Sequence, residues 1–169
     1  LDSGIIPSMI LWGPPGVGKT TLAYLIAKKL DRPFYNLSAI SSGVKEVREI
    51  IGQAGKSGGL FEKKKPLLFI DEIHRFSKTQ QDSVLGAVEK GTINLIGATT
   101  ENPSFEVISA LLSRCQVYNL QEHQKKDLEQ LLKNACELDT FLKKFTIEIK
   151  EPDYLIGLSG GDARKLLNV

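Results

Sequence analysis

Cysteine is scarce in this sequence, since its 169 residues include only Cys115 and Cys136. Two cysteines exclude a disulfide framework and a zinc site built from four cysteines. Two free thiols also fit a reducing compartment such as the cytosol. An excess of one charge is absent too, because 22 Lys and Arg residues against 20 Asp and Glu give a net charge of +2. This balance excludes an acidic disordered tail and a surface that is basic all over, while it leaves a local DNA-binding face open.

Long hydrophobic runs are also missing. No apolar run approaches the roughly 18 residues that span a bilayer, and residues 1–10 carry Asp2 without the basic start of a signal peptide. We therefore expect a cytoplasmic protein that makes no membrane contact. An initiator methionine is absent, and the last residue lies inside an expected helix that starts at Asp162. We therefore expect this chain to be a piece of a longer protein.

Apolar runs alternate with helical patterns over the first 120 residues. Short apolar runs predict strands at residues 8–12, 33–37, 67–70, 92–98 and 116–120. Helical spacing predicts helices at residues 18–30, 44–54, 77–89 and 107–112. The third helix has Ser77 as its expected N-cap and Gly91 as its expected stop. The alternation predicts an α/β fold, in which a five-stranded parallel sheet carries helices on both faces.

The pattern changes after residue 120, where only helical spacing continues. Helices are expected at residues 125–135, at 151–158 and from 162 onward. We interpret this part as a small helical domain and place the boundary so that residues 1–120 form the core and residues 121–169 a partial lid. The lysine run at residues 63–65 is interpreted as the solvated edge of a loop rather than as a DNA contact.

A complete phosphate-loop pattern follows the first expected strand. Residues Gly13-Pro14-Pro15-Gly16-Val17-Gly18-Lys19-Thr20 match G-x-x-x-x-G-K-[ST] at every fixed position. The glycines allow successive backbone N–H groups to point at one anion, and the next helix adds its positive N-terminal end. We expect Lys19 to reach the β- and γ-phosphates and the Thr20 hydroxyl to bind Mg²⁺. The alternative, a glycine-rich turn with an incidental lysine, does not account for all the fixed positions.

Two carboxylates, Asp71 and Glu72, follow the apolar run at residues 67–70. Ligands of open α/β sheets bind at the carboxyl ends of strands, so we expect Asp71 to lie beside the phosphate loop and to hold the Mg²⁺ shell. Side chains alternate along a strand, so Glu72 is expected on the other side, where it can act as a general base toward water. The alternative is that both acids only favour the start of a helix.

The two histidines do not predict a metal site. His74 and His123 have no second histidine or cysteine at metal-ligand spacing. A single histidine next to an acidic pair is more often a surface or packing residue, and we interpret His74 in that way. No metal site built by protein side chains alone is expected.

Five segments in this order resemble the motifs of an AAA+ ATPase. GPPGVGKTT, LLFIDEIHRF, GATTENPS, LLSRC and GGDARKLLN resemble Walker A, Walker B, sensor 1, the arginine finger and sensor 2, and the match covers residues 8–169. Residues 69–115 more closely resemble the RarA/MgsA family of replication-associated recombination ATPases, whose relatives include the Werner-helicase-interacting ATPase. The stretches HRF-x-K-x-QQD and GATTENPSFE are the specific parts of this resemblance.

The resemblance implies a role for several further residues. Thr100 takes the sensor 1 position, with Thr99 as the alternative. Arg114 takes the position of an arginine finger that reaches the ATP of the next subunit, and Arg164 that of sensor 2 on a lid helix. The residues alone favour surface cations at helix ends for both arginines, and only the resemblance points to these roles. The implied catalytic set is Lys19, Glu72, Thr100, Arg114 and Arg164, and the implied nucleotide contacts are Gly13, Pro14, Pro15, Gly16, Val17, Gly18, Lys19, Thr20, Thr21, Asp71 and Arg164.

The resemblance also implies an activity and partners. They are hydrolysis of ATP to ADP with Mg²⁺, coupled to DNA replication, recombination or repair at stalled forks or gaps. The implied partners are forked, gapped or single-stranded DNA, replication proteins such as single-strand-binding protein, and further copies of the chain in a bacterial, nucleoid-associated setting. No basic stripe with interleaved aromatics marks a single-strand platform, so the DNA expectation depends on the resemblance.

Alternatives remain at this level, namely a clamp-loader-like subunit and a non-catalytic nucleotide-dependent scaffold. Bacterial clamp-loader motors carry a four-cysteine zinc module between Walker A and Walker B, and no cysteine lies between Lys19 and Asp71. The RuvB motor inserts a hairpin before sensor 1, and residues 89–92 leave no room for one. The presence of Glu72, Thr100 and Arg114 favours a catalytic protein over a scaffold.

Overall fold

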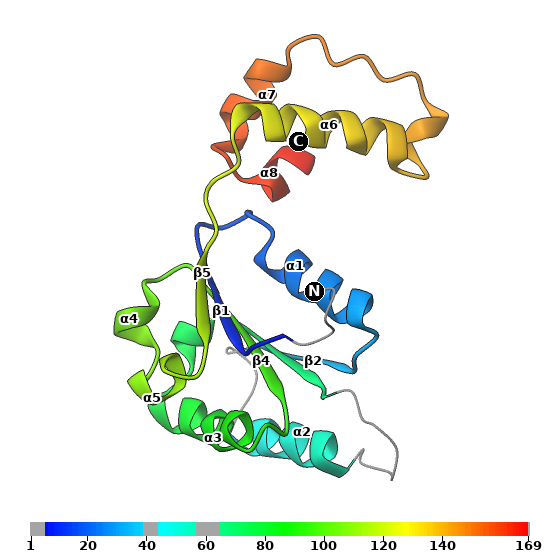
Figure 1. The fold of residues 1–169 in the computed structure, drawn as a ribbon. Coiled ribbons are helices and arrows are strands. Elements are labelled where there is room, and N and C mark those ends of the chain that lie inside the picture. Colours follow the sequence, from blue (N-terminus) through cyan, green and yellow to red (C-terminus); the bar gives the residue numbers. More distant parts are fainter. Residues whose placement is uncertain (1–5, 39–43, 57–64, 169) are drawn as a thin grey trace. The chain divides into compact units, whose positions relative to one another are not determined.

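The computed structural model describes residues 6–38, 44–56 and 65–168, and its contacts divide the chain into two units. The first unit holds residues 1–13 and 19–119, and the second holds residues 14–18 and 120–169. Of the lysine run, Lys63 and Lys64 lie outside the described residues, whereas Lys65 is exposed. Figure 1 shows a sheet with its helices in the first unit and a group of helices in the second.

The first unit is built on a five-stranded sheet. Its strands are β1 (Met9–Trp12), β2 (Phe34–Ser38), β3 (Leu67–Asp71), β4 (Asn94–Thr99) and β5 (Gln116–Asn119). They lie in the order β2-β3-β4-β1-β5, and every neighbouring pair is parallel. The predicted parallel sheet is therefore confirmed. Parallel pairing brings the carboxyl ends of all five strands to one edge of the sheet and their amino ends to the opposite edge.

The middle of the sheet is buried on both faces. All of Leu67, Leu68, Phe69 and Ile70 on β3 are 0% exposed, as a continuous apolar run in a central parallel strand requires. At the edge of the sheet, all four residues of β5 are exposed. Alternation of buried and exposed positions is lost in β3 because helices cover both of its sides.

Helices cover both faces of this sheet, as the alternation predicted. Figure 1 shows α1 (Lys19–Leu30) on one face and α2 (Val44–Lys56) with α3 (Lys78–Glu89) on the other. Val47 of α2 and Val84 and Ala87 of α3 share one core cluster with Leu68 and Ile70 of β3. Burial of apolar side chains against both faces is the main stabilising term for such a layered fold.

The ends of α3 follow the predicted signals. Ser77 caps the helix, because its Oγ accepts from the N–H of Gln80 at 3.3 Å while the Gln80 side chain accepts from the N–H of Ser77 at 2.8 Å. This reciprocal pair is a capping box. Gly91 follows the helix with φ of +64°, a left-handed conformation that glycine adopts without steric cost. Both expectations for this helix are confirmed.

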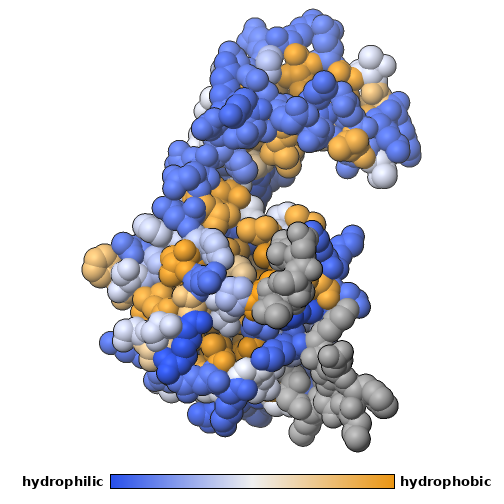
Figure 2. All heavy atoms as spheres, in the orientation of Figure 1, coloured by the Kyte–Doolittle hydropathy of each residue, from blue (hydrophilic) through white to orange (hydrophobic). Residues whose placement is uncertain are grey.

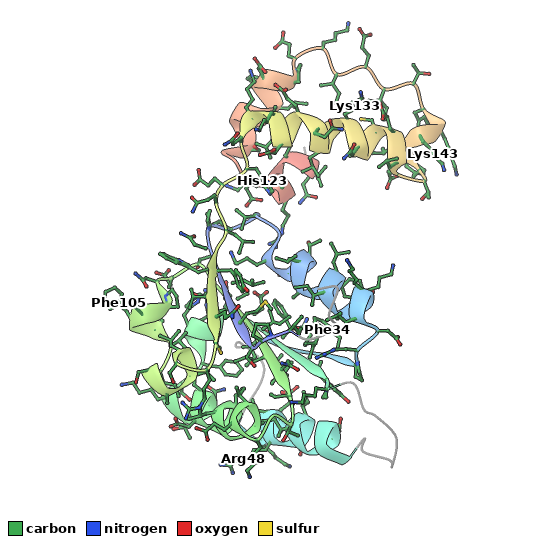
Figure 3. All side chains as sticks on the ribbon, viewed as in Figure 1. Phe34, Arg48, Phe105, His123, Lys133 and Lys143 are labelled. Carbon is green, nitrogen blue, oxygen red and sulfur yellow. The ribbon has the colours of Figure 1, made fainter. Side chains whose placement is uncertain are left out.

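The helix predicted at residues 107–112 is wrong in its extent. Two short helices occupy this region, α4 (Pro103–Glu106) and α5 (Ser109–Leu112), and the backbone of Val107 between them is extended. Asn102 caps α4 through its side chain and Pro103 occupies the first turn, so a helix begins earlier than the apolar spacing indicates. Phe105 of α4 is 84% exposed and points away from the ribbon (Figure 3).

Gln81 explains why the chain bends between these two helices. Its side chain is 1% exposed, and its Nε2 donates to the carbonyl oxygens of Phe76 at 3.1 Å and Glu106 at 3.0 Å. Its Oε1 accepts from the N–H of Ile108 at 2.9 Å. One buried amide therefore satisfies three backbone groups that a continuous helix would have paired differently.

The second unit contains short helices around a small core. They are α6 (Lys125–Leu138), the 3₁₀ turn η2 (Leu142–Lys144), α7 (Pro152–Ser159) and α8 (Ala163–Leu167). Leu128, Leu132 and Leu166 are the buried centre of this unit, and an ion pair of 2.7 Å joins Lys125 of α6 to Asp153 of α7. Hydrophilic residues predominate on the face of this unit that Figure 2 shows. Among the described residues, no helix combines the length and the apolar character that a membrane span needs.

Gly97 in β4 occupies a position with no space for a side chain. A Cβ atom built there would lie 2.7 Å from Cδ1 of Ile10 and 3.0 Å from Cδ1 of Ile73. Both isoleucines are fully buried, so neither can move into solvent. Gly86 in α3 differs, because no atom lies within 4 Å of the Cβ position there.

We therefore expect opposite effects from two identical substitutions. Gly97→Ala should lower the free energy of unfolding by about 1–3 kcal/mol, because the added methyl group overpacks a filled core. Gly86→Ala should raise it by about 0.5–1 kcal/mol, because alanine stabilises a helix relative to glycine. Urea denaturation of the two variants measures both values. A Gly97→Ala variant as stable as the parent would show that this part of the core is loosely packed.

Candidate nucleotide-binding site

The start of the phosphate loop is held at the carboxyl edge of the sheet. Gly13 follows β1 directly, and its N–H donates to the carbonyl oxygen of Thr99 at the end of β4, at 3.2 Å. Lys19 opens α1, is buried, and donates from Nζ to the carbonyl oxygen of Gly13 at 2.7 Å. The positive N-terminal end of α1 and the buried ammonium group of Lys19 together favour an anion at this edge.

The glycines between these two residues have the backbone conformation that the loop requires. Gly16 and Gly18 have φ of +75° and +89°, values that side-chain-bearing residues rarely adopt. No atom lies within 4 Å of a Cβ position at Gly18, so the requirement there is conformational rather than steric. Pro14, Pro15 and Val17 complete the loop, which the contacts group with the second unit. Thr20 and Thr21 are exposed on the first turn of α1.

The acidic pair lies at the carboxyl end of β3. Asp71 is the last residue of the strand, and its Oδ1 accepts from the N–H of Glu72 at 3.1 Å. Glu72 has φ of 52° and ψ of 50°, a left-handed conformation that is strained for a residue other than glycine. The expectation that strand alternation directs the Glu72 side chain is therefore wrong, because the strand ends one residue earlier and the backbone turns at Glu72.

The carboxylate of Glu72 is engaged by a cation of the same turn. Oε2 of Glu72 lies 2.7 Å from Nε of Arg75, and both side chains are partly exposed. The spacing of three residues, which puts both side chains on one side of the turn, could have indicated this pair in the sequence. The bond to Arg75 uses Oε2, and a carboxylate has lone pairs on both oxygens, so Oε1 of Glu72 can accept a proton while the pair is kept.

The side chain of His74 forms a hydrogen bond with the end of β4, so it is more than the surface or packing residue that was expected. Its Nδ1 lies 3.0 Å from Oγ1 of Thr99, which also accepts from the N–H of Glu101 at 3.0 Å. Thr99 is 1% exposed, whereas Thr100 is exposed. Thr99 is thus a structural link between β4 and the turn after β3, and Thr100 is the residue with a side chain available to a ligand. No spacing in the sequence indicates the bond between His74 and Thr99.

Arg114 lies at the opposite edge of the sheet from Gly13, Lys19 and Asp71. It precedes β5, whose first residue Gln116 is in register with Met9, the first residue of β1. Four strand residues at about 3.3 Å each separate the two edges by about 13 Å. Arg114 therefore lies at the amino edge of the sheet, whereas Gly13 lies at the carboxyl edge of the same chain.

Arg164 lies in the second unit, where it is exposed in the first turn of α8 and its backbone N–H donates to Oδ1 of Asp162 at 2.8 Å.

Cys115 follows Arg114, and burial raises the pKa of its thiol to about 11. Burial therefore disfavours the thiolate, which is the form of a cysteine that acts as a nucleophile. Within the described ranges, no group of three or more His, Cys, Asp or Glu residues could hold a metal ion.

Comparisons with known proteins agree with this geometry. Residues 9–122 match the family described as "ATPase family associated with various cellular activities (AAA)". Replication-associated recombination protein A from Coxiella burnetii is 46% identical over 172 residues, which cover 100% of this chain and 38% of the relative. The protein of the same name from Escherichia coli strain K12 is 48% identical, with 99% of this chain and 38% of the relative covered.

A eukaryotic relative and a solved structure extend the comparison. ATPase WRNIP1 from Dictyostelium discoideum is 48% identical over 97% of this chain and 19% of the relative. The Thermotoga maritima RuvB Holliday junction branch migration motor superimposes with a TM-score of 0.77 at 28% identity, over 97% of this chain and 53% of the motor. The chain thus spans less than two fifths of the length of the recombination proteins that it matches. The predicted family and fold are confirmed.

Proposed function

Because this chain belongs to the AAA family of ATPases, we propose that it binds ATP at the carboxyl edge of its sheet and hydrolyses it to ADP and phosphate. The observation that carries the proposal is that Gly13 and Lys19 follow β1 and that Asp71 and Glu72 lie at the end of β3, two parallel strands on either side of β4 that end at one edge. An anion-binding loop and two carboxylates in that arrangement provide phosphate binding, metal binding and a base in one place.

The phosphates would be held by the loop and the metal by two oxygen donors. Backbone N–H groups of residues 13–19 and the ammonium group of Lys19 bind the phosphates, with Thr21 beside them at the start of α1. The hydroxyl of Thr20 and the carboxylate of Asp71 are the hard oxygen donors that Mg²⁺ prefers. Mg²⁺, when bound, neutralises charge on the β- and γ-phosphates.

Glu72 would act as the general base. Its carboxylate accepts a proton from water as the water oxygen bonds to the γ-phosphorus and the bond to the bridging oxygen of ADP breaks. The 2.7 Å ion pair with Arg75 uses Oε2, so Oε1 can accept this proton while the pair is kept. Thr100, exposed at the end of β4, is the side chain that would place the water, since Thr99 is occupied by His74 and Glu101.

Arg114 and Arg164 would complete the site from two directions. The position of Arg114 at the amino edge of the sheet places it away from its own nucleotide, so it would act on the γ-phosphate of a neighbouring copy as an arginine finger. Arg164 would contact the nucleotide of its own chain from α8. This assignment requires an oligomer of the full-length protein.

The cellular role follows from the relatives rather than from the site. Two relatives at 46% and 48% identity are named for recombination that is associated with replication. We infer that hydrolysis by the full-length protein is coupled to work on forked, gapped or single-stranded DNA, together with replication proteins such as single-strand-binding protein, in the bacterial nucleoid. Residues 1–120 would form the ATPase core and residues 121–169 the first part of a lid.

Two substitutions separate binding from chemistry at this site. Lys19→Ala should lower ATP affinity at least about tenfold, because the phosphates lose a buried cation. Glu72→Gln should leave ATP affinity unchanged and lower turnover about 100-fold or more, because the amide cannot accept the proton. Calorimetry and phosphate release measure the two effects, with Lys28→Ala and Glu49→Gln as exposed controls on α1 and α2. Hydrolysis by Glu72→Gln at the parent rate would exclude Glu72 as the base.

DNA dependence tests the cellular role. Phosphate release by the full-length protein should rise severalfold with at least one of forked, gapped or single-stranded DNA, since a motor that works on DNA couples the two events. The panel is compared with blunt duplex DNA at the same nucleotide concentration and fixed salt, because backbone binding depends on salt. Equal rates with all four DNAs and with none would count against the DNA role and leave the ATPase assignment intact.

A further inference from the structure

A short ion pair holds the Arg114 side chain at the amino edge of the sheet. Nη2 of Arg114 lies 2.6 Å from Oε1 of Glu89, the last residue of α3, and the two side chains are 41% and 43% exposed. Nη1 of Arg114 also donates to the carbonyl oxygen of Ala110 at 2.7 Å and to Oγ of Ser113 at 2.9 Å. These last two partners belong to α5 and its C-cap, so Glu89 is the partner that ties the guanidinium to another element of the fold.

The donors that remain define what this arrangement can bind. A guanidinium has five N–H groups, of which two lie on each Nη and one on Nε. Ala110 and Ser113 take the two on Nη1, and Glu89 takes one on Nη2. The bonds described leave one N–H on Nη2 and the N–H on Nε for an acceptor from outside. Two donors on one planar group suit bidentate binding of a phosphate.

Glu89 is unexpected at the end of a helix. The carboxyl end of a helix carries a partial negative charge, so an acidic side chain there is locally unfavourable. The neighbouring Asp82 lies two turns earlier on α3 and is exposed. The ion pair with the cation Arg114 offsets this unfavourable position of the Glu89 carboxylate.

The ion pair also faces open space that another molecule can enter. Glu89 and Arg114 line a cavity of about 520 Å³ together with Ser8, Lys65 and Asn94, residues at or next to the amino ends of β1, β3 and β4. Nη1 of Arg32 binds Oδ1 of Asn94 at 3.0 Å and adds a third cation to this edge. The positive charge around the cavity favours an approaching polyanion such as a nucleoside triphosphate.

We propose that Glu89 is a positioning residue for catalysis, which orients the Arg114 guanidinium before a neighbouring copy presents its γ-phosphate. The proposal rests on the proposed function, since it assigns Arg114 a phosphate in another subunit. Holding the side chain in place beforehand removes the entropy that Arg114 would otherwise lose at each turnover. Glu89 itself touches neither substrate nor water in the reaction.

A double-mutant cycle in the full-length protein tests this role. Glu89→Gln should lower kcat about three- to tenfold, the usual size of an interaction between neighbouring side chains, while KM for ATP changes less than twofold. In the Arg114→Ala background the same substitution should have no further effect. Single-turnover hydrolysis of radiolabelled ATP measures the slow rates of that background. Asp82→Asn removes the same charge from the same helix and is the matched control.

The outcomes distinguish the possible failures. A kcat for Glu89→Gln equal to that of Asp82→Asn and the parent would overturn the role of Glu89, while a large loss in Arg114→Ala still supported the arginine finger. An equal loss from Glu89→Gln in both backgrounds would show that Glu89 acts by stabilising the fold, which thermal unfolding would confirm. If Arg114→Ala hydrolysed ATP at the parent rate, the proposed finger and the role of Glu89 would both be wrong.

Discussion

The parallel pairing of five strands is the constraint on which the rest of this molecule depends. After each strand the chain must return to the amino edge before the next strand starts. Helices make these crossings over both faces, and every strand therefore ends at the same edge. Gly13 after β1, Asp71 and Glu72 at the end of β3 and Thr100 after β4 lie at that edge for this reason. The same pairing sends the residues before β5, including Arg114, to the opposite edge.

Each of the two edges carries an ion pair that involves a proposed catalytic residue. At the carboxyl edge Glu72 is bound by Arg75, and at the amino edge Arg114 is bound by Glu89, with N–O distances of 2.7 Å and 2.6 Å. Catalysis can leave both pairs intact. Glu72 can accept a proton on Oε1 while Oε2 stays with Arg75, and Arg114 can keep Glu89 and still offer two N–H groups.

Sequence reasoning predicted the sheet, its helices and the residues of the phosphate loop, because apolar runs and the glycine-lysine pattern are local signals. It failed where a distant side chain decides the local structure. Gln81 bonds to Glu106 and Ile108 and so separates α4 from α5, whereas the apolar spacing predicted one helix at residues 107–112. The left-handed turn at Glu72 redirects a side chain that strand alternation had placed elsewhere. The bond between His74 and Thr99 joins residues 25 positions apart, and no spacing rule covers that.

The central claim is that one active site is completed by two copies of the chain, and mixed oligomers of the full-length protein test it most directly. Glu72→Gln subunits keep Arg114 and Arg114→Ala subunits keep Glu72, so some interfaces of a mixture contain both intact residues. With co-assembly verified by energy transfer between labelled subunits, phosphate release by the mixture should exceed the average of the two variants measured separately. A rate equal to that average would contradict a shared site.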